Sequence, residues 1–224
     1  MHNFVYKMTS PLYQPFKNFD FKNQLCFLSG ARPVEPARVL ADWLIEMANL
    51  SGEEQIKLLD ESIRTYKSLT VPANPQVYND FIQPLEEKIE AAFKEGYKGL
   101  LELEEIDLFN WIGKLMYSFL YIEMQGAIRL NQLNGDGMNM SQGLMHKFGN
   151  LHTMLQSIHR AVIFEDFTPW SMLIVPLSDA NTAFSFRDEI NTLTFSLKFK
   201  DFGIIACLQD NGTNKRYQDR KSVV

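Results

Sequence analysis

The chain has 224 residues, enough for one large domain or two small ones, and its 46% hydrophobic and 12% aromatic residues exclude a disordered protein. The formal net charge of -5 gives no support to a nucleic-acid-binding surface, which is normally basic because phosphate neutralisation supplies most of the affinity. Two cysteines, Cys26 and Cys207, lie far apart and form no pair motif, so we expect no disulfides and a cytoplasmic location.

Neither a signal peptide nor a membrane span is expected. The N-terminus has no continuous apolar run after a basic start. The most apolar long stretch, 108–124, is interrupted by Asn110, Lys114 and Glu123, and it falls short of a membrane span.

The N-terminal third is expected to mix an irregular arm with short elements. Residues 1–25 are rich in proline, asparagine and aromatic residues, and we expect them to lead into a short strand over 19–27. A helix is predicted from Pro36, because proline suits the first helical turn and apolar residues follow at helical spacing. An S-x-x-E capping box at the start of 51–66 predicts a second helix.

The middle of the chain is predicted to be helical. A short β-prone stretch at 69–71 is followed by a helix that starts at Pro84 and stops at Gly96. Long apolar patterns then predict helices over 105–133 and 141–164.

The C-terminal part changes to a strand pattern. An apolar strand is expected at 172–175, and apolar and polar residues alternate in 184–187 and 193–199. A tight turn then leads to a strand at 204–208, which makes an antiparallel sheet.

Four short blocks carry a resemblance to a known family. They are Cys26-Phe27-Leu28-Ser29-Gly30, the stretch 37–44, the stretch 71–79, and Leu85-Glu86. The chain resembles a bacterial group of HNH-endonuclease-like proteins, whose pattern runs C-x-x-C-G, E-H-V-x-P-x-W-L, V-P-x-x-C-x-x-C-N and then a helix near L-E. The matching residues of the second and third blocks are Val39, Trp43, Leu44, Val71, Pro72 and Asn79. A looser similarity extends to 108–111, 169–171, 186–188 and 208–210.

The resemblance implies a ββα-metal site whose chemistry is missing here. In the family, four cysteines hold a structural zinc and a histidine activates water beside a second metal. Cys26 stands at the first zinc position, but the other three hold Ser29, Pro75 and Tyr78. Arg38 replaces the histidine and stays protonated, so it cannot act as a general base. We therefore expect no metal and no cofactor.

Without zinc, burial of apolar side chains must hold this region together. The residues expected to form that core are Trp43, Leu44, Val71, Leu85, Ile89 and Phe93.

A second candidate site lies on the helix predicted over 141–164. His152, Gln156 and His159 share one face at i, i+4 and i+7, and Glu165 with Asp166 follows. A metal or acid–base cluster is one interpretation. We favour a structural role, because histidines seven residues apart lie about two turns apart, too far for one metal.

Carboxylates at strand ends form a third candidate. Arg187 and Asp188 end one expected strand, and Asp210 ends another. Such groups can bind metals, but more often they are turn residues or surface ion pairs, which is the interpretation we favour.

Taken together, the patterns predict an α+β fold. The expected regions are a degenerate HNH-like ββα part over 1–95, helices over 96–166, an antiparallel sheet packed on them over 167–210 and a polar tail over 211–224. The expected function is a non-catalytic scaffold that binds another protein or a second copy of itself. Two alternatives stay open: an enzyme of unknown type with a helical histidine and glutamate site, and a nucleic-acid binder that does not cleave.

Overall fold

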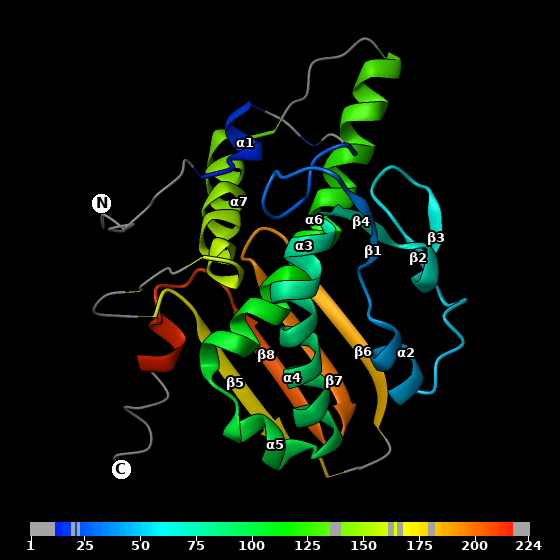
Figure 1. The fold of residues 1–224 in the computed structure, drawn as a ribbon. Coiled ribbons are helices and arrows are strands. Elements are labelled where there is room, and N and C mark those ends of the chain that lie inside the picture. Colours follow the sequence, from blue (N-terminus) through cyan, green and yellow to red (C-terminus); the bar gives the residue numbers. More distant parts are fainter. Residues whose placement is uncertain are drawn as a thin grey trace. The chain divides into compact units, whose positions relative to one another are not determined.

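The structure is a computed structural model, shown in Figure 1, and it describes residues 12–18, 21, 23–134, 140–160, 164, 168–178 and 182–216. The elements in chain order are α1 (Pro15–Asn18), β1 (Glu35–Arg38), α2 (Asp42–Met47), β2 (Gln55–Lys57), β3 (Ile63–Thr65), η1 (Tyr66–Ser68), β4 (Thr70–Ala73), α3 (Pro75–Val77), η2 (Tyr78–Ile82), α4 (Gln83–Lys94), α5 (Tyr97–Glu102), α6 (Glu105–Asn134), α7 (Gln142–Leu155), η3 (Gln156–Ile158), β5 (Ser171–Pro176), β6 (Thr182–Glu189), β7 (Thr194–Lys200) and β8 (Phe202–Cys207).

The chain divides into two compact units. The hairpin unit contains the described parts of 11–84 and 114–159, and the sheet unit contains those of 85–113 and 160–224. Each unit is built from segments far apart in the sequence. The predicted α+β fold, with helices in the middle and a C-terminal antiparallel sheet, is confirmed.

The sheet unit is built on four antiparallel strands in the order β5-β8-β7-β6 (Figure 1). The alternation predicted for β7 holds, since Phe195, Leu197 and Phe199 are buried while Lys198 and Lys200 are exposed. A strand with one apolar face must bury that face against another element.

Helix α4 covers this apolar face. The ring of Phe93 lies 5.4 Å from the ring of Phe199 and 5.0 Å from that of Phe202. Leu85 and Ile89 are also buried, as predicted. Gly96 ends α4 with φ +68°, a conformation that glycine adopts without steric cost, so the predicted stop is confirmed.

The hairpin unit contains the antiparallel pair β1–β4, and the helix expected from Pro36 is wrong. Pro36 lies in β1, opposite Pro72 of β4. The Pro72 carbonyl accepts from the Phe27 N–H at 2.7 Å, so its backbone oxygen points away from β1. At such a position Pro36 needs no N–H for the pairing, and helix α2 begins only at Asp42.

The helix expected over 51–66 is also wrong, because β2 and β3 form an antiparallel hairpin there. The Ser51 and Glu54 side chains do hydrogen-bond each other at 3.0 Å, and the Ser51 N–H donates to the Glu54 carboxylate. Gly52, however, has φ +80°, which turns the chain out of a helical path. The tip of the hairpin is tied to α6, where Glu123 accepts from the Leu59 N–H at 2.8 Å.

Other boundaries also differ from the prediction. The described residues of 19–27 form turns rather than a strand, and the helix expected from Pro84 already begins at Pro75. Helix α6 matches its prediction to within one residue, whereas α7 stops at Leu155 and passes into the short 3-10 helix η3. Trp43 is only half-buried and so is not the core residue that we expected, although Leu44 and Val71 are buried.

The polar tail begins with ordered structure. Residues 213–216 form a helical turn, and the backbone N–H groups of Gly212 and Asn214 donate to the carboxylate of Asp210. Residues 217–224 lie outside the described part of the chain. Among the helices that the structure describes, none combines the length and apolar character of a membrane span.

Candidate functional site

The first candidate position, Cys26, begins a tight turn in the hairpin unit. The Gly30 N–H donates to the Cys26 carbonyl at 2.9 Å, and the Cys26 N–H donates to the Ala31 carbonyl at 3.1 Å. Gly30 has φ +71°, and Ser29 accepts from the Ala31 N–H through its side chain. These three hydrogen bonds close the turn from within.

The thiol of Cys26 belongs to the aromatic core of the hairpin unit. Cys26 is 0% exposed, and Phe27 stacks on Tyr117 with ring centroids 6.1 Å apart. Burial, and then the neighbouring Tyr13, Tyr121 and Cys26, raise the pKa of Tyr117 well above its usual range. Cys26 thus packs as a small apolar residue beside a neutral phenol.

Arg38 ends β1 and is exposed. Its guanidinium forms an ion pair with Asp42, four residues later at the start of α2. A guanidinium engaged in this way has no basic nitrogen, so Arg38 cannot take the part of the missing histidine.

The remaining motif positions lie where β4 passes into helix. Asn74 caps this helix by accepting from the Val77 N–H at 3.1 Å and donates to the Pro33 carbonyl at 2.9 Å. Pro75 occupies the first turn, Tyr78 is half-buried and Asn79 is exposed.

These residues do not fit a tetrahedral zinc. Proline offers no side-chain donor, and one buried thiol with a serine hydroxyl and a phenol is not a zinc ligand set. Within the described residues, no group of three or more His, Cys, Asp or Glu side chains is arranged to hold a metal ion. The expectation that Cys26 binds no metal stays a prediction.

His152 of α7 is buried in the same unit and is fixed by the backbone. Its Nε2 lies 3.0 Å from the Leu28 carbonyl, and the Gln156 amide donates to the same oxygen at 2.8 Å. A carbonyl only accepts, so a hydrogen bond to Leu28 requires a proton on Nε2. Burial lowers the pKa of His152 to about 3, more than the Leu28 carbonyl raises it.

A base this weak holds no proton near neutral pH, so His152 is suited to hydrogen bonding rather than to general acid–base work. His159 is half-buried with its ring edge-on to Phe81, at 6.3 Å between centroids. Glu165 and Asp166 lie outside the described residues. The predicted histidine cluster is therefore described only in part.

In the sheet unit, the three strand-end candidates have separate surroundings. Arg187 and Asp188 are exposed on β6, opposite Ser196 and Phe195 of β7. Asp210 instead organises the C-terminal turn, since it accepts from the Ser171 hydroxyl at 2.7 Å as well as from backbone N–H groups.

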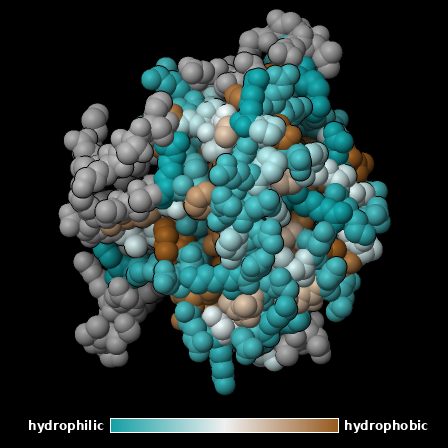
Figure 2. Space-filling view, in the orientation of Figure 1, coloured by the Kyte–Doolittle hydropathy of each residue, from teal (hydrophilic) through white to brown (hydrophobic). Residues whose placement is uncertain are grey.

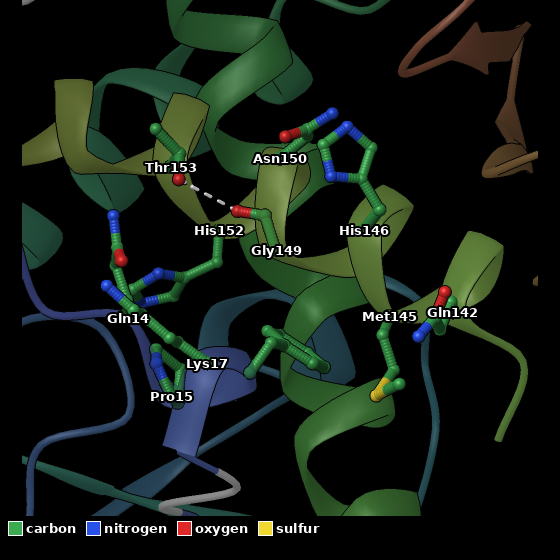
Figure 3. Close-up of a pocket in the computed structure, with 11 residues that line it drawn as sticks. Gln14, Pro15, Lys17, Gln142, Met145, His146, Gly149, Asn150, His152 and Thr153 are labelled. Carbon is green, nitrogen blue, oxygen red and sulfur yellow. Dashed lines mark hydrogen bonds between the residues drawn. The ribbon is translucent and has the colours of Figure 1, made fainter.

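A pocket of about 480 Å³ opens between α1 and α7 of the hairpin unit (Figure 3). Pro15, Phe16 and Met145 supply its apolar lining. The polar lining residues are Gln14, Lys17, Gln142, His146, Asn150, His152 and Thr153, and Gly149 completes the set. Figure 3 shows the imidazole of His152 extending from α7 toward the α1 side, where Tyr13 meets it edge-on at 5.5 Å.

Sequence reasoning identified His152 but missed this pocket. Glycine at 149 leaves room on the face of α7 that meets α1, and Phe16 would lie only 3.7 Å from a Cβ there. A helical face with Gln142, His146 and Gly149 at i, i+4 and i+7 was the available signal. Its partner segment, more than a hundred residues earlier, could not be identified from periodicity.

Comparison with known proteins does not identify a relative. No protein-family model matches the chain, and no curated protein or solved structure is significantly similar to it. The residues of the chain therefore carry the functional argument.

Proposed function

We propose that this protein is a non-catalytic binding module, built on a ββα unit that resembles the bacterial HNH-endonuclease-like proteins. The observation that carries the proposal is the full burial of Cys26 in an aromatic core, at the position where the family would hold zinc. A scaffold that fills its metal region with packed side chains retains a fold without the chemistry of the family.

The local arrangement supports the ββα part of the proposal. Strands β1 and β4 pair antiparallel, and a helix follows β4 after a single residue, Asn74. The Cys26 turn is joined to β4 through the Phe27 N–H and the Pro72 carbonyl. The first three blocks of the resemblance thus lie in the hairpin unit, whereas Leu85-Glu86 belongs to the sheet unit.

The pocket between α1 and α7 supports binding as the function. Its volume of about 480 Å³ lies within the range of small-molecule sites, and its lining mixes apolar and hydrogen-bonding side chains. Neither Arg38, in its ion pair with Asp42, nor His152, on the Leu28 carbonyl, offers a base that works near neutral pH. The alternative of an enzyme with a helical histidine site is therefore less well supported.

Protein partners remain within the proposal. The exposed large hydrophobic side chains of the described residues are Leu59, Ile63, Phe81, Leu101, Leu130 and Ile205. On the face drawn in Figure 2, hydrophobic residues form small separate patches among hydrophilic ones. We therefore favour the pocket over a broad apolar surface for another protein or a second copy. A cytoplasmic location belongs to the same proposal, in keeping with two free cysteines.

The absence of nuclease chemistry is tested with supercoiled plasmid DNA. Purified protein is incubated with Mg²⁺, Mn²⁺, Ni²⁺ or Zn²⁺, and we expect no nicking above a buffer control, because Arg38 cannot activate water. An Arg38→Ala variant prepared in parallel controls for contaminating nuclease. Metal-dependent nicking by the wild type that Arg38→Ala abolishes would overturn the proposal.

A further inference from the structure

We propose that the pocket between α1 and α7 binds a small organic anion whose polar body is held by amide side chains. The inference deepens the proposed binding function and does not depend on the resemblance to HNH-like proteins. It rests on the charge of the two segments that form the pocket, on the lining side chains and on the rigidity of one wall.

The charge of these segments departs from that of the chain as a whole. The chain has 27 acidic residues, yet none lies in 11–19 or in 137–159, the stretches of the hairpin unit that contain α1 and α7. The same stretches carry Lys17 and Lys147. In a protein with a net charge of -5, these two stretches are therefore net positive, which favours an anion as the ligand.

The pocket lining has the same character. Among the described lining residues there is no aspartate or glutamate, and Lys17 and His146 supply nitrogen donors. Gln14, Gln142 and Asn150 bring amides that both donate and accept hydrogen bonds. An anion with hydrogen-bonding groups on its body matches these side chains, whereas a cation or a purely apolar molecule does not.

One wall of the pocket is held in place by hydrogen bonds. His152 is 1% exposed, and its Nε2 lies 3.0 Å from the Leu28 carbonyl oxygen. The imidazole is therefore positioned before any ligand arrives. Thr153 is also fixed, because its hydroxyl donates to the Gly149 carbonyl at 2.8 Å. Pre-set side chains reduce the entropy lost on binding.

The preference for an anion is tested by isothermal titration calorimetry on the full chain, with three charged probes and their uncharged counterparts. The pairs are adenosine monophosphate with adenosine, glycerol phosphate with glycerol, and benzoate with benzamide. We expect at least one anion to bind at least about tenfold more tightly than its counterpart. If no anion binds, or if each uncharged counterpart binds as tightly, the proposal is wrong.

One pair of variants tests whether the ligand lies in the pocket. Gly149→Leu puts a side chain into it, whereas Gly143→Leu adds the same group to α7 at a position with nothing within 4 Å of a Cβ. We expect Gly149→Leu to abolish binding and Gly143→Leu to leave it intact, with both variants showing the wild-type circular dichroism spectrum. If Gly149→Leu does not fold, the smaller Gly149→Ala, whose Cβ lies at ordinary contact distance from Phe16, takes its place and weakens binding several-fold.

Charge is tested separately with Lys17→Gln, for which the exposed Lys57→Gln of β2 is the control. Lys17→Gln is expected to weaken binding of the anion about tenfold and to leave binding of the uncharged counterpart unchanged. Equal losses in both lysine variants, or binding of a single-stranded oligonucleotide with no binding of any small anion, would overturn the proposal. A positive plasmid-nicking result would refute the non-catalytic function without affecting these titrations.

Discussion

At the scale of single residues, His152 shows how burial sets chemistry. Its imidazole is held by the Leu28 carbonyl and surrounded by the rings of Tyr13 and Tyr117. Burial, with a further contribution from the nearby His159, lowers its pKa from the ordinary 6.5 to about 3. The folded protein therefore keeps this histidine neutral at pH values where the unfolded chain protonates it.

This shift predicts a loss of stability in mild acid. Above pH 6.5 His152 is neutral in both the folded and the unfolded protein, so protonation of this residue does not reduce the free energy of unfolding there. As the pH falls below that value the unfolded state alone takes up the proton, so the free energy of unfolding decreases by up to about 1.4 kcal/mol per pH unit. Urea denaturation between pH about 7 and about 5 measures the slope, which should become shallower in His152→Gln. Equal slopes in the wild type and in His152→Gln would contradict this assignment of the slope to His152.

At the scale of elements, two polar motifs in the hairpin unit show why a local signal does not decide structure alone. Ser51 and Glu54 form the hydrogen bonds of a capping box, but a β-hairpin follows them. Asn74 instead caps a continuous helical stretch from Pro75 to Lys94 and also bonds the Pro33 carbonyl. The Ser51–Glu54 bonds join residues within one turn, whereas the Asn74 bonds cap a helix and also join it to a segment 41 residues earlier.

We therefore predict a larger cost for Asn74→Ala than for Ser51→Ala. Asn74 is buried, and its loss removes a helix cap and leaves the Pro33 carbonyl without this donor, so the free energy of unfolding should fall by about 2 kcal/mol. Ser51 is exposed, and its substitution should cost less than about 0.5 kcal/mol. Urea melts of both variants give the comparison. A Ser51→Ala loss as large as that of Asn74→Ala would mean that the Ser51–Glu54 bonds support the β2–β3 hairpin.

At the scale of the whole molecule, each unit has its own core of packed aromatic side chains. In the hairpin unit Phe16, Phe21, Phe27, Tyr117 and Tyr121 form a continuous set of ring contacts. The sheet unit has its own set, in which Phe93 touches Trp111, Phe199 and Phe202. A chain of this length buries enough surface to fold without zinc.

Metal removal should therefore leave stability unchanged. We predict that excess chelator, or added Zn²⁺, shifts the thermal midpoint by less than about 1 °C, because a bound metal would stabilise the native state in proportion to the logarithm of its concentration. Differential scanning fluorimetry with and without chelator makes the measurement. A chelator-dependent fall of several degrees that is absent in Cys26→Ala would show that Cys26 holds a metal after all.

Much of the sheet unit and of the long helices was determined by the sequence alone. Alternation in 193–199 and long apolar periodicity in 105–133 are local signals, because each element buries one face whatever it packs against. Tertiary structure decided the rest: Pro36 became part of a strand because β4 offers a partner that needs no N–H from it. The pocket between α1 and α7, and the bond from His152 to Leu28 across 124 residues, arise from packing between distant segments. Periodicity within a segment predicts which face is buried, but it does not predict which distant segment packs against that face.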